Sequence, residues 1–379
     1  MEPLIILING NYMKLKRDKI LELLDQVIHP ENSESIMRSG ILEDVKVDGN
    51  NIEVSLLFLK PTDPFINSIK RSINDIIIKN FGKNIVVNIT TKIKPKVINK
   101  DKETTGIDKI KNIIAVASGK GGVGKSTVTV NLAIALAKEG YKIAVIDADI
   151  YGPSIPKMFG VENEKPAGVI EDGKEYIIPI EKYGIKILSV GFFVDPSDAT
   201  IWRGPMATNV LRQLILQAKW GDIDYLLFDM PPGTSDIHLT LVQTVPVTGA
   251  IIVSTPQDVA IADARKGISM FKTKGIEVPV LGLVENMAWF TPAELPQNKY
   301  YIFGKGGVEK LAKDTGTRLL AHIPIVQSVC ESGDNGVPVA LDPSSIEGLA
   351  FNELANEFID AVKERNEKLP PTKQVNVQQ

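Results

Sequence analysis

The residue types that could do chemistry gather in one glycine-rich segment of this 379-residue chain, Ser118 to Thr127. Gly119 is followed by four residues and then by Gly124–Lys125–Ser126, a spacing typical of loops that wrap phosphate groups. Glycines let backbone N–H groups turn toward phosphate oxygens, and the dipole of a following helix favours negative charge. We therefore expect a nucleotide to be bound by the whole loop: Gly119, Lys120, Gly121, Gly122, Val123, Gly124, Lys125, Ser126 and Thr127.

Two side chains of the loop are expected to act on the nucleotide directly. Lys125 would reach the β- and γ-phosphates, and the hydroxyl of Ser126 would bind Mg²⁺. An apolar run at 113–116 precedes the loop and a helical pattern at 128–137 follows it, as the motif requires. The alternative is a glycine-rich turn without a ligand, and these flanking patterns argue against it.

Three aspartates follow apolar runs that read as buried strands. Asp147 and Asp149 end the run 143–146, and Asp229 ends the run 225–228. In an open parallel sheet, ligands bind outside the carboxyl ends of the strands. We expect Asp229 to orient Mg²⁺, Asp147 to assist at the metal, and Asp149 to orient or deprotonate the attacking water. A turn cap is the alternative for any one of them.

Lys120 places a second cation inside the loop. With it, the loop resembles those of the deviant phosphate-loop ATPases, a group that includes the nitrogenase iron protein and MinD/ParA. The resemblance implies an ATP-bridged homodimer in which Lys120 stabilises transition-state charge across the interface. The expected catalytic residues are then Lys120, Lys125 and Asp149. A solvated loop lysine is the alternative for Lys120.

Longer strings resemble the Mrp/ApbC iron–sulfur cluster carrier family over nearly the whole chain. The strings are Asp147–Ser154, Trp202–Pro205, Asp229–Asp236 and Glu285–Met287. The resemblance implies an ATP-hydrolysing homodimer that delivers iron–sulfur clusters to apoproteins, with ATP and Mg²⁺ as cofactors. It also implies that Asn286 contacts the adenine edge, although a structural asparagine at a strand end fits almost as well.

The chain departs from the family pattern at the site where the cluster ligands are expected. Members of this family usually carry Cys–Pro–x–Cys shortly after the Glu–Asn–Met string, whereas this chain has Thr291–Pro292–Ala293–Glu294. Cys330 is the single cysteine of the chain, so two copies supply at most two thiolates. Any cluster ligands are therefore not identifiable. A cluster-free ATPase switch that binds a protein client is the alternative function, and a partition or septum-positioning ATPase ranks last.

The elements that must position these residues read as an α/β protein. Short apolar runs separated by helical patterns predict a mostly parallel sheet in a P-loop NTPase domain, preceded by a small α+β domain. The predicted strands lie at 113–116, 143–146, 225–228, 251–253 and 280–284. We predict an α+β domain at 13–95 similar to an iron–sulfur-assembly domain, a linker at 96–110, the ATPase domain at 111–366 and a flexible tail at 367–379.

In the small domain, alternating residues on both sides of Asp48–Gly49–Asn50 predict a hairpin. A helix is predicted from Asp63–Pro64, as N-cap and first residue, to Gly82. A strand is predicted at 85–89. A helical pattern beginning at Met13 also suggests that translation starts there, which intact-mass measurement of native protein would test.

The net charge and the apolar content of the chain exclude some classes of function. The chain has 43 Lys and Arg and 46 Asp and Glu, a formal charge of −3, which excludes capture of nucleic acid by the whole chain. No apolar stretch approaches about 20 residues, so we expect a cytoplasmic protein that binds neither membrane nor nucleic acid. His238 and His322 lack metal-ligand spacing and read as structural. Helix core positions are expected at Met206, Leu211, Leu214 and Leu216.

Overall fold

The computed structural model describes most of the chain. The described residues are 5–8, 11–14, 17–30, 35–58, 63–82, 84–93, 106–150, 152–171, 173–193, 204–233, 236–292, 294–295 and 297–374. The chain divides into two compact units, residues 1–103 and 104–379. Each unit is described here by itself. Most of the predicted linker at 96–110 lies outside the described residues.

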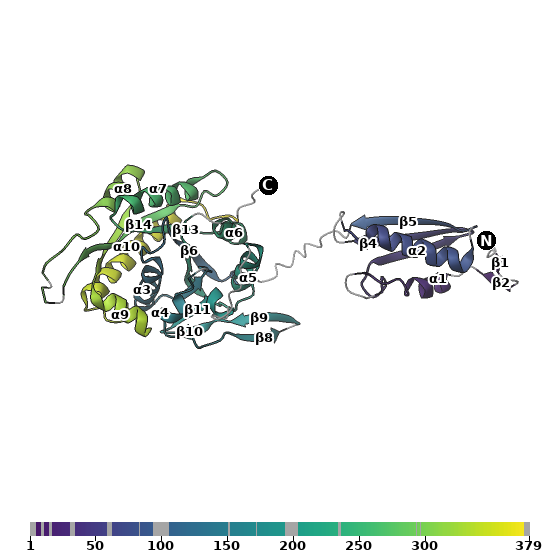
Figure 1. Cartoon of the computed structure of the whole chain (residues 1–379), viewed down its shortest axis with the longest axis horizontal. Helices are drawn as coiled ribbons and strands as arrows, with labels where there is room; N and C mark the ends of the chain where they lie inside the picture. Colours follow the sequence, from purple (N-terminus) through teal and green to yellow (C-terminus); the bar gives the residue numbers. More distant parts are fainter. Residues whose placement is uncertain are drawn as a thin grey trace. The chain divides into compact units, whose positions relative to one another are not determined.

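The first unit is a small α+β structure (Figure 1). A three-stranded sheet of order β3-β4-β5 carries α1 and α2, with β3 antiparallel and β5 parallel to β4. Its elements are β1 (Ile5–Ile8), β2 (Asn11–Lys14), α1 (Arg17–Leu24), β3 (Leu42–Asp48), β4 (Asn51–Phe58), α2 (Ile66–Phe81) and β5 (Val86–Ile93). Isoleucine, leucine, valine and phenylalanine side chains of the two helices and the sheet form its own apolar core.

Two local signals in this unit are confirmed, the hairpin turn and the end of α2. The hairpin turns at Gly49, which has a φ of +56° that glycine adopts without strain. Helix α2 ends before Gly82 as predicted, but its predicted start is wrong, because Phe65 is the N-cap and Ile66 the first helical residue. The Asp63 carboxylate accepts a hydrogen bond from the Phe65 backbone N–H at 2.9 Å, in the turn that precedes the helix. The helical pattern predicted from Met13 is wrong at its start, because Met13 pairs with Ile6 in the β1–β2 hairpin and α1 begins at Arg17.

The second unit is built on an eight-stranded, mostly parallel sheet, as predicted. Its order is β10-β11-β7-β12-β6-β13-β14-β15, and β10 runs antiparallel to β11. The strands are β6 (Ile110–Ser118), β7 (Ile143–Asp147), β10 (Ile180–Lys182), β11 (Ile185–Ser189), β12 (Ile223–Asp229), β13 (Gly249–Ser254), β14 (Val280–Phe290) and β15 (Leu319–Ile325). All five predicted strands are present, and β6, which leads into the phosphate loop, lies between β12 and β13.

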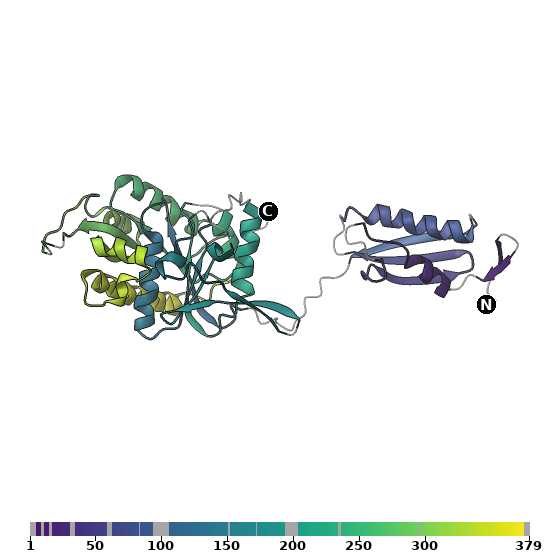
Figure 2. The ribbon, with the colours of Figure 1, turned by 60° about the horizontal axis from the view of Figure 1, so that its bottom comes forward.

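Helices cover both faces of this sheet (Figures 1 and 2). Alternate residues of β6 belong to different cores: Ile114 and Val116 pack with α3, α4 and α10, whereas Ile113 and Ala115 pack with α5 to α8. This alternation is why the strands read as continuous apolar runs. The helices are α3 (Lys125–Lys138), α4 (Ile155–Met158), α5 (Gly204–Leu216), α6 (Asp236–Thr244), α7 (Asp258–Lys272), α8 (Gly307–Thr315), α9 (Gln327–Asn335) and α10 (Ile346–Lys368).

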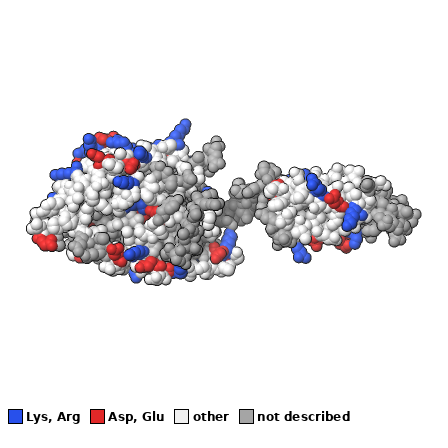
Figure 3. Space-filling model, in the orientation of Figure 1, with Lys and Arg blue, Asp and Glu red and all other residues white. Residues whose placement is uncertain are grey.

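The remaining elements are short. A hairpin of β8 (Ala167–Glu171) and β9 (Lys174–Ile178) forms a separate two-stranded sheet, and the 3-10 turns η1 (Val190–Phe193) and η2 (Val339–Leu341) follow β11 and α9. Among the described residues, no helix combines the length and the apolar composition needed to cross a membrane. In the view of Figure 3, lysine and arginine are interspersed with aspartate and glutamate over the described surface, in keeping with the near-neutral net charge.

One predicted core position is wrong. Leu211 and Leu214 of α5 are buried, but Met206 is 49% exposed. At about 100° per residue, Met206 lies roughly 140° around the helix from Leu211. Ala207, one residue later, is the position in the first turn of α5 that meets the core.

Candidate nucleotide site

The glycine-rich segment forms a loop between the end of β6 and the start of α3. The Ser118 hydroxyl donates to the Lys120 carbonyl at 3.0 Å, and Gly124 stands before the helix with a φ of +78°. A Cβ on Gly119 would lie only 2.1 Å from the Asp263 backbone of α7, so only glycine fits there. The loop lines a cavity of about 190 Å³, together with Asp149, Ser154, Met158 and Pro232. Eight of the nine predicted loop residues therefore line one cavity, and the ninth, Gly119, packs against α7 instead.

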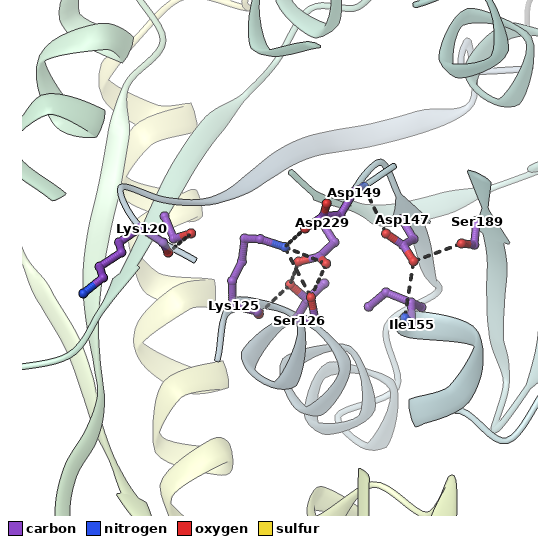
Figure 4. Close-up of polar contacts among 10 residues, drawn as sticks. Lys120, Lys125, Ser126, Asp147, Asp149, Ile155, Ser189 and Asp229 are labelled. Carbon is purple, nitrogen blue, oxygen red and sulfur yellow. Dashed lines mark hydrogen bonds and ion pairs between the residues drawn. The ribbon is translucent and has the colours of Figure 1, made fainter. Parts of the chain in front are cut away.

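Lys125 lies at the centre of the polar contacts in Figure 4. Its ammonium is 2.8 Å from Asp229 Oδ2 and 3.9 Å from Asp149 Oδ2. Lys125 and Asp229 are both buried, so their charges interact with little screening by water. The two strand-end acids that come from β7 and β12 thus converge on the loop lysine, as expected for the carboxyl edge of a parallel sheet.

Ser126 and Asp229, two of the residues expected at Mg²⁺, contact each other directly. The Ser126 hydroxyl donates to Asp229 Oδ2 at 2.5 Å, and the Thr129 hydroxyl lies 2.8 Å from Asp229 Oδ1. A hydroxyl and a carboxylate next to a phosphate cavity are oxygen donors of the kind that Mg²⁺ takes alongside nucleotide phosphates and water. The residues present therefore fit Mg²⁺.

Sequence reasoning missed Thr129. Its hydroxyl also bonds the Lys125 carbonyl at 3.0 Å, one helical turn earlier. Thr129 follows Lys125 by four residues, which places both residues on one face of α3. This spacing is the sequence feature that could have identified Thr129. Thr129 is fully buried and fixes the Asp229 carboxylate from the side opposite Ser126.

Asp147 is placed differently from the other acids. It is fully buried, and it accepts hydrogen bonds from the Asp149 backbone N–H, the Ile155 backbone N–H and the Ser189 hydroxyl. Burial, and next the charge of Asp229, raises the pKa of Asp147 to about 8. The described contacts use this carboxylate to hold the segment after β7 against α4 and β11. Its role at the metal stays a prediction, and no motif pointed to Ser189.

Lys120 and Asp149 both line the cavity, but their side chains take different directions. In Figure 4 the Lys120 side chain extends away from the Lys125–Asp229 cluster, and Lys120 is exposed. Asp149 is largely buried beside Lys125. An exposed loop cation at the edge of the phosphate cavity is placed where another molecule can reach it.

Asn286 supports the loop from β14. Its side-chain amide donates to the Val123 carbonyl at 2.8 Å, and a Cβ on Gly124 would lie 2.2 Å from that amide nitrogen. Asn286 and Met287 also line a second cavity of about 460 Å³, which shares Gly124 and Thr127 with the phosphate cavity. The amide group therefore has a structural role, and contact with adenine stays a prediction.

The segment at the missing cysteine pair lies just beyond β14. Thr291 is buried, Glu294 is exposed, and Ala293 lies outside the described residues. Cys330 lies in α9, but its side chain is not among those described. Within the described part of the chain, no three His, Cys, Asp or Glu side chains are grouped to hold a metal ion.

Both predicted structural histidines have neighbours that account for them. His238 is buried in α6 with its ring 6.3 Å from that of Phe271. The Nδ1 of His322 in β15 lies 2.6 Å from a carboxylate oxygen of the buried Glu285 in β14. The hydrogen bond to Glu285 raises the pKa of His322 above its ordinary value.

Comparison with known proteins gives two family matches. Residues 109–359 match the ParA family, described as NUBPL iron-transfer P-loop NTPase. Residues 17–89 match a family described as iron–sulfur cluster assembly protein. The first match contains every predicted site residue, and the second spans most of the described first unit.

Individual relatives agree with these matches. An iron–sulfur cluster carrier protein of Synechocystis is 39% identical over 350 residues, covering 92% of this chain and 98% of the relative. One from Escherichia coli K12 is 48% identical over 270 residues, covering 71% and 72%. A solved nucleotide-binding protein from Archaeoglobus fulgidus in complex with ADP is 40% identical, with a TM-score of 0.53, covering 61% of this chain and 88% of that chain.

Proposed function

The chain belongs to the Mrp/ApbC family of iron–sulfur cluster carriers within the MinD/ParA group of P-loop NTPases, and from this premise we propose that it is an ATP hydrolase. It would convert ATP and water to ADP and phosphate while acting as a homodimer in the cytoplasm. The observation that carries the proposal is the convergence of Lys125, Ser126 and Asp229 beside the phosphate cavity.

Each residue has a distinct task in this proposal. Lys125 binds the β- and γ-phosphates, and Ser126 and Asp229 hold Mg²⁺, which neutralises phosphate charge when bound. Asp149 orients the attacking water and accepts its proton, because it lines the same cavity beside Lys125. Lys120 extends from the loop toward solvent, a placement that suits contact with the phosphates of a second copy.

The second cavity suits the nucleoside. It shares Gly124, Thr127, Ser154 and Met158 with the phosphate cavity. Its wall also contains apolar residues, among them Met287, Pro324 and Ile325. A largely apolar pocket with few polar groups is typical of a site for an aromatic base. Because the Asn286 amide nitrogen donates to Val123, its carbonyl oxygen is the atom that would accept a hydrogen bond from adenine.

We propose that the protein delivers iron–sulfur clusters to apoproteins, because it belongs to a family of iron–sulfur cluster carriers. A second candidate is a cluster-free ATPase switch that binds a protein client. The observation that favours the second candidate is the absence of both thiols at Thr291 and Glu294. Carboxylate and hydroxyl oxygens are poor substitutes for thiolates on iron and sulfide.

The ATPase proposal is tested by phosphate release from the purified full-length chain with MgATP. We expect turnover in the wild type and a loss of at least about a hundredfold in Lys125→Ala, which removes the buried cation at the phosphates. Lys274→Ala, which changes an exposed lysine elsewhere, is the matched control. Unchanged hydrolysis in Lys125→Ala would refute the site assignment.

Anaerobic reconstitution with iron and sulfide decides between the two cargo candidates. Carriage predicts a stoichiometric amount of iron per dimer and a visible absorption band. It also predicts that Cys330→Ser lowers the iron content, since Cys330 is the single thiol. Iron at background level in the wild type would leave the protein-client switch as the function.

A further inference from the structure

A third cavity, distinct from the nucleotide site, opens at the amino ends of the parallel strands. Its volume is about 940 Å³, and it is lined by the start of β6, by α5, by residues around the end of α6, and by the end of α10 with the segment that follows. β6 spans nine residues from this cavity to the phosphate loop. At about 3.3 Å per residue, the two sites lie roughly 25 Å apart on opposite edges of the sheet.

Arg365 is the charged residue most deeply placed in this cavity. It is 9% exposed and lies in the last turn of α10. Its Nη atoms donate to the Pro370 carbonyl, the Thr372 hydroxyl and the Asn366 side chain. Its Nε is buried and has no hydrogen-bond partner in the structure. Burial lowers the pKa of Arg365, as expected for a cation removed from water.

No described carboxylate forms an ion pair with Arg365, although buried charges in proteins are usually paired. The end of a helix favours a cation, but only through a partial charge. A buried guanidinium whose Nε–H is unused therefore offers a site for an anion from outside the chain.

Most of the other charged side chains that line the cavity are cations. Arg212 of α5 and Lys373 are exposed cations in its wall, and Lys111 pairs with Asp224, which is not part of the lining. Asp108 is the acid among the described lining residues. Apolar side chains complete the wall: Ile107, Ile110, Ile113, Leu216, Pro246 and Leu369.

We propose that this cavity binds a small organic anion, with its carboxylate or phosphate group at Arg365 and Arg212 and its carbon body against the apolar wall. The volume is at the upper end of the range for small-molecule sites. Guanidinium N–H groups donate well to carboxylate and phosphate oxygens, and the Nε–H of Arg365 is unused while the Arg212 side chain is exposed. The site is built by the two ends of the ATPase unit, since Ile107 precedes β6 and Thr372 follows α10.

Calorimetric titration of the full-length chain tests the proposal. The chain is saturated with MgADP to fill the phosphate loop, and ionic strength is matched with NaCl. The probes are citrate as a polycarboxylate, glycerol 2-phosphate as a phosphate ester, and glycerol as the neutral reference. We expect at least one anion to bind with a Kd below about 1 mM, and glycerol not to bind.

Arg212→Gln identifies the site, because Arg212 is exposed and its replacement leaves the core intact. We expect this change to weaken anion binding at least about fivefold. Lys274→Gln, an exposed lysine outside the lining, should stay within about twofold of the wild type. Binding of only one of the two anions supports the proposal and shows whether the site takes a carboxylate or a phosphate group. The absence of binding by both anions, or equal binding by wild type and Arg212→Gln, overturns it.

Discussion

At the scale of single residues, Lys125 is the point on which the site depends. Its ammonium contacts two aspartates from other parts of the chain, Asp149 and Asp229, and the hydroxyl of the adjacent Ser126. Two of these contacts join acids at or just after the ends of β7 and β12 to the loop. Lys125 therefore interacts with both carboxylates. The replacement of Lys125 therefore leaves the buried Asp229 carboxylate without its paired cation.

Asp149→Asn is expected to separate binding from hydrolysis. Asparagine keeps the shape of the side chain but cannot take a proton from water, so MgADP should bind within about threefold of the wild type while turnover falls about 10²-fold or more. Nucleotide binding is measured by calorimetry and turnover by phosphate release. Asp360→Asn, on the exposed side of α10, is the matched control.

The opposite pattern would contradict the role given to Asp149. Lost nucleotide binding with Asp149→Asn would assign the residue to the metal or to the fold of the loop. Retained turnover would exclude it as the group that activates water.

At the scale of elements, β14 links the nucleotide site to the segment that replaces the family's cysteine pair. Asn286 of β14 bonds the loop at Val123, and Thr291, one residue past the strand, bonds the Ile325 carbonyl of β15. The strand also carries Glu285, which accepts from the Val308 N–H at the start of α8 and contacts His322. The loop, α8 and β15 are therefore tied together by side chains of one strand.

His322 should make the stability of this region depend on pH. Its pKa is raised chiefly by the hydrogen bond to Glu285, with smaller contributions from the charges of Glu309 and Glu353. A raised folded-state pKa stabilises the fold below the unfolded pKa of about 6.5, and this stabilisation is lost as pH rises through the folded value. His322→Gln should therefore lower the urea midpoint more at pH 5.5 than at pH 8.5.

The effect is expected to be small, because the His322 side chain is 37% exposed and water screens the pair. The matched background is Glu285→Gln, in which His322→Gln should lose its pH dependence. An equal shift of the urea midpoint at both pH values, in the wild-type background, would show that the pair does not titrate as argued.

At the scale of the whole molecule, the two units have separate cores. The core of the first unit contains residues between 20 and 85, and the two cores of the second lie between 113 and 362. No core cluster of the described residues spans both units. The residues proposed for catalysis, the two cavities proposed for the nucleotide and the cavity proposed for an anion all belong to the second unit.

Residues 104–379 alone should therefore fold and hydrolyse ATP. We expect a cooperative thermal transition and a turnover within about threefold of the full-length chain, because no group of the site is removed. Circular dichroism and phosphate release measure the two properties. An unfolded fragment, or one that folds without turnover, would show that the first unit takes part in the ATPase activity.

The sequence by itself determined the sheet, the loop and the acids at the strand ends. These features follow from local rules: buried parallel strands need continuous apolar runs, and a phosphate loop needs glycines at set positions. Both signals lie within short stretches of chain, so Gly119 to Thr127, Asp149 and Asp229 could be assigned without any contact information. The hairpin at Gly49 and the end of α2 at Gly82 followed from equally local signals.

Only the tertiary structure decided which groups those residues meet. The bonds from Thr129 to Asp229, from Ser189 to Asp147 and from Asn286 to Val123 join residues 100, 42 and 163 positions apart. The cavity at Arg365 joins the start of β6 to the segment after α10. Hydrophobic periodicity specifies which face of an element is buried, but it does not specify which polar partners the packing brings to that face. Those partners follow from the strand order and from the way the helices cross the sheet.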